Sequence, residues 1–291
     1  DEFFAAAARF FQPVSKWRRP IVFLQFVLPH LARIFGLNGI DKTPVKFFTK
    51  VVSDTIKYRL KNGVRRSDFL QLLLDAILTE LVITAQCVLF YIAGYDTTAT
   101  TLSFVSYCLA LHPKIQQKLL EEIDQVLQDC DSNITFEVIQ NMTYLDMVFA
   151  ETLRLYPPAP RVDRRCTKDY VLPEVGLSIH KNTKITIPIY SIHRDPRHYE
   201  DPEKFDPERF SQSAKAGRPP MVYLPFGSGP RNCIGWRFAL MEAKVALVHI
   251  LKDFVFIPSK KTQVPIVLER SSGLLKAIDG VWVRIVTRTD S

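Results

Sequence analysis

Residues 225–235 read Pro-Phe-Gly-Ser-Gly-Pro-Arg-Asn-Cys-Ile-Gly. Glycine and proline interrupt this stretch so often that it predicts a loop. The residues that follow, Trp236 to Leu251, carry apolar side chains at helical spacing and predict a helix. Cys233 is therefore expected just ahead of a helix N-terminus, and the rest of the chain is interpreted around that placement.

The chemistry of this loop follows from its residue types. A helix dipole and free backbone N–H groups favour the thiolate form of Cys233. Gly227, Gly229 and Gly235 allow the backbone to approach a large flat group that side chains would push away. Arg231 offers a cation to an anionic group on the same molecule. The pattern favours haem, with Cys233 as axial thiolate and Arg231 paired with a propionate.

A simpler interpretation of the loop exists. A lone cysteine is usually a small buried hydrophobe, and a glycine–proline loop is usually only a turn, so the loop alone leaves both possibilities open. The order Phe-Gly-x-Gly-x-Arg-x-Cys-x-Gly, from Phe226 to Gly235, resembles the haem-binding signature of the cytochromes P450. The resemblance implies that residues 226–235 form a haem–thiolate loop, with Phe226, Gly227 and Gly235 against the cofactor.

Composition sets the broad limits. The 291 residues are 47% apolar and 23% charged, enough for one large core or two small domains. Five cysteines without a CxxC pair indicate neither a disulfide framework nor a zinc site, and favour a reducing compartment. The net charge of +8 suits anionic lipid or an acidic protein. Its cations are scattered, so we expect no nucleic-acid partner.

The first 40 residues are aromatic and basic. Trp17, Arg18 and Arg19 precede an apolar stretch, Ile21 to Leu31, that is too short and too interrupted to span a bilayer. Residues 1–40 are therefore a candidate membrane-interface segment, with a buried helix pair as the alternative. The chain opens on Asp1, without an initiator methionine or signal peptide, which suggests a fragment.

Helices are predicted over residues 43–62, after a Ser67-Asp68 cap as far as Leu74, over 79–112 and over 113–127. The third of these is long and apolar. Its stretch from Leu81 to Ala93 is almost unbroken and is expected to be buried on all sides. That stretch is too short for a transmembrane span.

Polar residues follow within the same predicted helix, in Ala93-Gly94-Tyr95-Asp96-Thr97-Thr98. A mid-helix glycine costs about 1 kcal/mol, and a buried carboxylate needs partners. One interpretation is a kink whose polar groups bond only to backbone. The other is an oxygen site, and it resembles the acid–alcohol pair of the P450 family. The resemblance implies that Gly94 makes room beside the haem, Ala93 contacts it, Thr97 holds dioxygen and Asp96 relays protons.

Glu151 and Arg154 lie three apart on a predicted helix and can pair. Alone they predict only a surface ion pair. Glu-x-x-Arg is also the helix motif of the resembled family, where it locks to a later arginine. That arginine is Arg209, within Phe205 to Phe210. The resemblance implies a structural network that supports the cysteine loop.

Short β-rich stretches predict a small sheet over 170–172, 177–179 and 184–188, with closing strands over 254–256, 266–268 and 281–285. By resemblance, Arg164 is the second propionate partner, residues 158–160 line the substrate cavity and the turn at 271–275 enters it. His193 is expected to open the next helix. It has no second ligand at metal spacing, so we interpret it as structural.

The resemblance covers nearly the whole chain and is closest to the microsomal drug-metabolising branch that includes the vertebrate 3A subfamily. It implies a mainly α, P450-type fold with a small β region (α+β). Residues 1–291 would be the C-terminal portion of one such domain, with the N-terminal part missing.

The implied reaction is monooxygenation of an apolar small molecule. Electrons would come from NADPH through a flavin-containing reductase, with cytochrome b5 as a second donor, at the cytosolic face of the endoplasmic reticulum membrane. Arg237 and Lys244 are candidates for the docking face. Two alternatives stay open: a P450-like isomerase or dehydratase that needs no external electrons, and a non-catalytic fragment that holds no haem.

Overall fold

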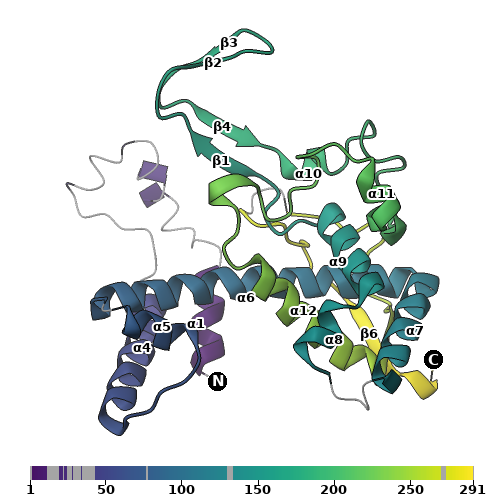
Figure 1. Ribbon diagram of the computed structural model, residues 1–291, viewed down its shortest axis with the longest axis horizontal. Coiled ribbons are helices and arrows are strands. Elements are labelled where there is room, and N and C mark those ends of the chain that lie inside the picture. The colour runs from purple at the N-terminus through teal and green to yellow at the C-terminus, as the bar shows by residue number, and fades with distance from the viewer. Residues whose placement is uncertain are drawn as a thin grey trace. The chain divides into compact units, whose positions relative to one another are not determined.

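The computed structural model describes residues 2–11, 20–21, 23–24, 28, 34, 43–76, 78–129, 134–269 and 273–290. Two compact units divide the chain, Asp1–Asp96 and Thr97–Ser291. Helix α6 (Glu80–Leu111) crosses their boundary. Most of the candidate membrane-interface segment, residues 1–40, lies outside the described residues. The helical content with small sheets confirms the predicted fold class (Figure 1).

The first unit contains α1 (Glu2–Phe11), α4 (Thr43–Asn62), α5 (Phe69–Asp75) and the start of α6. The predicted cap of α5 is confirmed, because the Asp68 side chain accepts the backbone N–H of Gln71 at 3.0 Å. Asp68 also accepts two hydrogen bonds from the guanidinium of Arg59, at 2.8 and 2.5 Å. The Arg59 guanidinium lowers the pKa of Asp68 to about 2, so the carboxylate stays charged.

Aromatic rings form the core of this unit. Phe48 is 4% exposed and packs against Tyr91 with ring centroids 4.4 Å apart. Around this pair lie Phe3, Phe47 and Tyr95. The core is therefore a small cluster between α1, α4 and α6.

One expectation for α6 is wrong. In its first half Leu81 is 80% exposed and Leu89 is 55% exposed, while Ile83 and Thr84 are buried. The apolar composition of this stretch predicts burial, but a side chain is buried only where another segment packs against it. The described residues do not cover both faces of this helix. By length and composition α6 is the one helix among the described residues that could cross a membrane.

The second unit consists mainly of helices that pack around an apolar core. Besides the rest of α6, its longer helices are α7 (Pro113–Asp129), α9 (Thr143–Leu155) and α12 (Trp236–Leu251), and the short α8 (Phe136–Gln140) lies between α7 and α9 in the chain. Leu109, Leu119, Leu145 and Leu247 are fully buried in that core. The bounds of α12 agree with the predicted ones.

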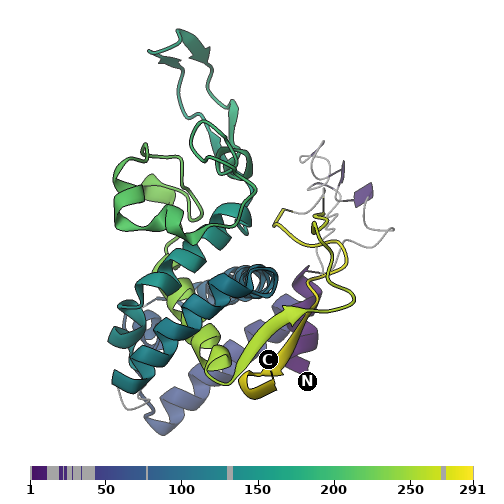
Figure 2. The ribbon, with the colours of Figure 1, turned by 90° about the vertical axis from the view of Figure 1, so that its right-hand side faces the viewer.

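Three antiparallel strand pairs complete this unit: β1 (Val162–Arg165) with β4 (Lys184–Ile187), β2 (Tyr170–Leu172) with β3 (Leu177–Ile179), and β5 (Phe254–Pro258) with β6 (Val283–Thr287). The β2–β3 hairpin extends away from the helices of the unit, whereas β5 packs beside α12 (Figures 1 and 2). Residues 266–268 were expected to form a strand, yet contribute only the isolated bridge from Leu268 to Ala277.

Short helical turns connect these elements. They are α10 (Ile189–Ile192), η1 (Pro207–Phe210), α11 (Gln212–Ala216), η2 (Gly229–Arg231) and η3 (Arg288–Asp290). His193 caps the C-terminus of α10, so the expectation that it opens a helix is wrong.

Candidate functional site

The cysteine loop is closed by its own backbone. The N–H of Cys233 donates to the carbonyl of Phe226 at 2.9 Å, and the N–H of Gly227 donates to the carbonyl of Leu224 at 3.0 Å. Gly227 and Gly229 have φ angles of 71° and 77°, a region that glycine enters without steric cost. Gly235 then caps α12. The predicted loop ahead of a helix is therefore present.

The loop presents its cysteine outward. Cys233 is exposed, and its neighbour Ile234 is 86% exposed. In α12, Phe238 is 74% exposed. A Cβ added at Gly235 would meet no atom within 4 Å. An open thiol next to exposed apolar side chains fits a large, flat, apolar group that carries a thiolate-binding iron ion, as haem does.

Two cations gather at this loop. Arg164 lies on β1 and its guanidinium donates to the backbone carbonyl of Arg231 at 3.4 Å. Arg231 is exposed and Arg164 is half-buried. The two arginines predicted to pair with propionates are thus brought together, although they are 67 positions apart in the chain. Two arginines that lie next to each other in this way fit a group with two carboxylates, such as the propionates of haem.

Beneath the loop lies the predicted charge network. Arg154 and Glu151 have no exposed side-chain surface, and the Arg154 guanidinium binds the Glu151 carboxylate at 2.7 and 2.8 Å. Arg209 lies 3.5 Å from the same carboxylate, which also accepts the N–H of Asp206. The remaining N–H groups of Arg154 donate to the carbonyls of His193, Pro202 and Lys204. The predicted Glu151–Arg154–Arg209 network is confirmed.

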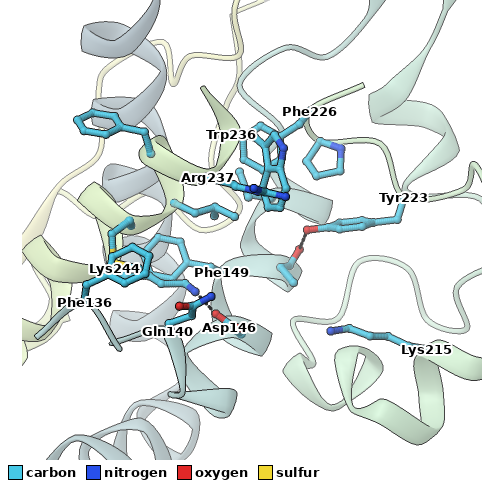
Figure 3. Close-up of a pocket in the computed structure, with 16 residues that line it drawn as sticks. Phe136, Gln140, Asp146, Phe149, Lys215, Tyr223, Phe226, Trp236, Arg237 and Lys244 are labelled. Carbon is cyan, nitrogen blue, oxygen red and sulfur yellow. Dashed lines mark hydrogen bonds and ion pairs between the residues drawn. The ribbon is translucent and has the colours of Figure 1, made fainter. Parts of the chain in front are cut away.

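Three consecutive residues before the loop are also held in place. The Tyr199 hydroxyl donates to the carbonyl of Val222 at 3.0 Å. The Tyr223 hydroxyl donates to a carbonyl of α9, that of Ala150, at 3.0 Å (Figure 3). The N–H of Leu224 donates to Nε2 of His193 at 2.8 Å. Sequence reasoning missed these contacts, because nothing local marks a side chain that bonds to distant backbone.

A groove of about 670 Å³ lies beside the loop, between α8, α9 and α12. Figure 3 shows Phe226 and Trp236 at one end and the Lys244–Asp146 ion pair at the other. Lys244 is buried and committed to that pair, so it is a poor candidate for a docking cation. Arg237 is exposed and lies 5.2 Å from the Trp236 ring.

The predicted oxygen-site residues lie on α6, which runs through them without a break. A Cβ added at Gly94 would meet no atom within 4 Å, so there is space beside it. Ala93, Gly94 and Asp96 belong to the first unit and Thr97 opens the second. The first three therefore belong to a different unit from the cysteine loop, and their role towards it stays a prediction.

The two segments expected to line the substrate cavity lie side by side. The N–H of Leu275 donates to the carbonyl of Pro158 at 2.9 Å. A cavity of about 390 Å³ opens there, bordered by Pro160, Leu274 and Leu275. Ser271 and Ser272 of the same turn lie outside the described residues.

Known proteins resemble this chain along nearly all of it. The sequence profile of the family described as Cytochrome P450 matches residues 2–283. Cytochrome P450 9e2 of Blattella germanica is 42% identical over 295 residues, 94% of this chain and 55% of the relative. Cytochrome P450 3A41 of Mus musculus is 43% identical, over 92% of this chain and 56% of the relative. Cytochrome P450 3A2 of Rattus norvegicus is 47% identical, over 86% and 52%.

These matches place the molecule in a class: it belongs to the cytochrome P450 family, whose members bind haem through a cysteine thiolate. The chain spans about half the length of the curated relatives it matches. The predicted likeness to the vertebrate 3A members is confirmed.

Replacing Arg154 should destabilise the second unit strongly. Arg154→Ala leaves the Glu151 carboxylate buried without its cation, and breaking a buried pair in this way costs about 3–5 kcal/mol. Urea unfolding followed by circular dichroism measures this loss.

Arg197→Ala is the matched control. Arg197 pairs with Asp195 at the surface, where its side chain is 81% exposed, so the unfolding midpoint should hardly change. Equal losses for the two variants would contradict a supporting role for the buried network.

The buried His193 should make stability depend on pH. Burial first, and then the charges of Arg154 and Arg194, lower the pKa of His193 from 6.5 to about 4. Between these values the unfolded chain binds a proton that the folded chain does not. The free energy of unfolding should therefore be full above pH 6.5 and fall by about 1.4 kcal/mol per pH unit towards pH 4. Urea unfolding at several pH values tests this. In His193→Gln the free energy of unfolding should fall less steeply between pH 6.5 and pH 4.

Proposed function

We propose that this chain is the C-terminal portion of a haem–thiolate monooxygenase domain. The observation that carries the proposal is the outward-facing Cys233 in a glycine-shaped loop at the start of α12. Arg164 and Arg231 beside it, and the buried Glu151–Arg154 pair beneath it, support the same assignment.

Each residue has a distinct role in this proposal. Cys233 ligates the iron, and Phe226, Gly227, Gly235 and Ala93 border the haem. Arg231 and Arg164 bind its propionates. The bound haem supplies the activation of dioxygen, and electron donation from the thiolate favours O–O cleavage.

Residues of α6 supply the protons in this proposal. Gly94 would leave space beside the haem, the Thr97 hydroxyl would donate a hydrogen bond to dioxygen, and Asp96 would supply protons to the same place. One oxygen atom then enters an apolar substrate and the other leaves as water. The exposed apolar side chains near the loop and in α6 favour an apolar substrate over a charged one.

The partners follow from the family. Electrons come from NADPH through a flavin-containing reductase, with cytochrome b5 as a second donor. The exposed Arg237 is part of a basic docking face for such acidic partners. The location is the cytosolic face of the endoplasmic reticulum membrane, with residues 1–40 at the membrane surface.

One rival function rests on a specific observation. The first half of α6 is largely exposed among the described residues. This exposure favours a non-catalytic fragment that does not hold haem. An isomerase or dehydratase that needs no external electrons is the rival within haem chemistry, and dependence of turnover on NADPH separates it from the monooxygenase.

The haem assignment can be tested by spectroscopy. Purified protein is mixed with haem, reduced and exposed to carbon monoxide, and the difference spectrum is expected to show the band of a thiolate-ligated haem. Cys233→Ser should lose this band, because a hydroxyl does not replace the thiolate. Cys166 is half-buried and directly follows β1, and it provides the control: Cys166→Ser should keep the band. A thiolate band that survives in Cys233→Ser would refute the assignment.

The oxygen-site assignment predicts a separate effect. In haem-loaded protein supplied with reductase, NADPH and a fluorogenic alkoxycoumarin, Thr97→Val and Asp96→Asn should lower product formation by about 10²-fold, because proton delivery is lost. The thiolate spectrum should stay unchanged. Ser103→Ala removes an exposed hydroxyl from the same helix and should leave turnover intact. Equal effects of all three variants would contradict the assignment.

A further inference from the structure

His193 is a buried side chain that the proposed chemistry does not use. It has no exposed surface and lies at the C-terminal cap of α10. Its backbone carbonyl accepts a hydrogen bond from the Arg154 guanidinium at 2.8 Å. Its ring lies against Tyr223, with centroids 5.4 Å apart and planes 24° apart. The imidazole is therefore fixed in place and in orientation.

The contacts of the ring define its tautomer. A backbone N–H can only donate, and the N–H of Leu224 points to Nε2 at 2.8 Å, so Nε2 carries no hydrogen. The hydrogen then lies on Nδ1, which donates to the carbonyl of Arg154 at 3.1 Å. Both ring nitrogens are engaged, and only the neutral Nδ1–H form satisfies both bonds. Protonation would place two N–H groups face to face at Leu224.

Three hydrogen bonds and one peptide bond, between Phe226 and Gly227, lead from this ring to the cysteine. Leu224 donates to His193 through its N–H and accepts the N–H of Gly227 through its carbonyl, at 3.0 Å. Two residues later Phe226 accepts the N–H of Cys233 at 2.9 Å. Arg154 on α9, His193, Leu224 and the loop are thus linked in order. In this path, the side chain of His193 connects α9, at the carbonyl of Arg154, to Leu224, the residue just before the loop.

We propose that His193 is a positioning residue for Cys233, and that its neutral Nδ1–H tautomer transmits the position of α9 to the cysteine loop. The proposal rests on the assignment of Cys233 as the haem ligand, but the position of the loop can be measured without haem. It goes beyond the charge network, because the network ends at backbone carbonyls and His193 contacts the loop entry itself.

Hydrogen–deuterium exchange on the haem-free protein gives the first test. His193→Phe keeps a ring of similar size and removes both hydrogen bonds. Backbone amides of residues 224–235 should exchange about tenfold faster or more, because Leu224 loses its acceptor. His112→Phe is the matched control: His112 is half-buried in the same unit, its ring bonds to the carbonyl of Cys108 one turn earlier, and it packs against Phe205 with centroids 5.1 Å apart. At equal overall stability, equal exchange of the loop in the two variants would overturn the proposal.

A pair of polar substitutions keeps the test decisive if the phenylalanine variant does not fold. In His193→Gln the side-chain oxygen reaches the place of Nε2 and can accept from Leu224. In His193→Asn the amide replaces Nδ1 and falls short of Leu224. We expect a protected loop in the glutamine variant and faster exchange in the asparagine variant. Equal protection in both would refute a role for the Nε2 bond.

Haem provides a second readout. If the wild-type protein shows the thiolate band with carbon monoxide, His193→Asn should shift part of it to the band of a neutral thiol ligand, and His193→Gln should retain it. If the wild-type protein takes up no haem, the proposed function fails, while the exchange measurements still decide whether His193 positions the loop.

Discussion

The guanidinium of Arg154 has no exposed surface, and the architecture around the cysteine loop depends on satisfying it. A guanidinium has five N–H donors, and removing its charge from water costs several kcal/mol unless they are paired. Two donate to the Glu151 carboxylate and the others donate to the carbonyls of His193, Pro202 and Lys204. One charge thereby fixes the backbone at separate places after β4. An arginine that reached fewer acceptors would destabilise this core instead of organising it.

The backbone that Arg154 fixes is connected to the loop through uncharged side chains, two tyrosines and a histidine. Residues 222–224 are each held by one hydrogen bond: Tyr199 donates to the carbonyl of Val222, and His193 accepts the N–H of Leu224. Between them, the hydroxyl of Tyr223 donates to the carbonyl of Ala150 on α9. Buried polar atoms that all have partners make a rigid segment, because any shift leaves one of them unsatisfied. The loop that follows therefore begins from a fixed point. Its two glycines at positive φ then determine where the chain turns.

The sequence anticipates those parts of the structure that local chemistry decides. The bounds of α4 and α12 follow from helical periodicity, and the start of α5 follows from the Asp68 cap. The cysteine loop was predicted from glycine, proline and the motif, and the Glu151–Arg154 pair from its spacing. Strand β1 was missed, because a charged four-residue segment becomes a strand only by pairing with β4.

Contacts between distant residues escape prediction for a related reason. Nothing in the sequence near His193 indicates that its ring accepts the N–H of a residue 31 positions later. The exposure of Leu81 and Leu89 in α6 has the same origin, since burial depends on surface that other segments supply. The roles of Gly94, Asp96 and Thr97 remain predictions, because they depend on contacts across the boundary between the two units.

The cysteine loop shows how a fold can leave one reactive group free. The N–H of Cys233 is used inside the loop, so the backbone needs no ligand to hold its shape. The sulfur has no such constraint and stays exposed beside Ile234. A site arranged in this way is formed before the ligand binds. The entropy cost of ordering the loop is therefore met on folding and does not weaken binding. Arg164 on β1 and Arg231 in the loop lie next to each other through the hydrogen bond from the Arg164 guanidinium to the Arg231 carbonyl. Binding of a flat dianionic group would then require little rearrangement, and the strength of the iron–sulfur bond would depend on how firmly His193 and its neighbours hold the residues that precede the loop.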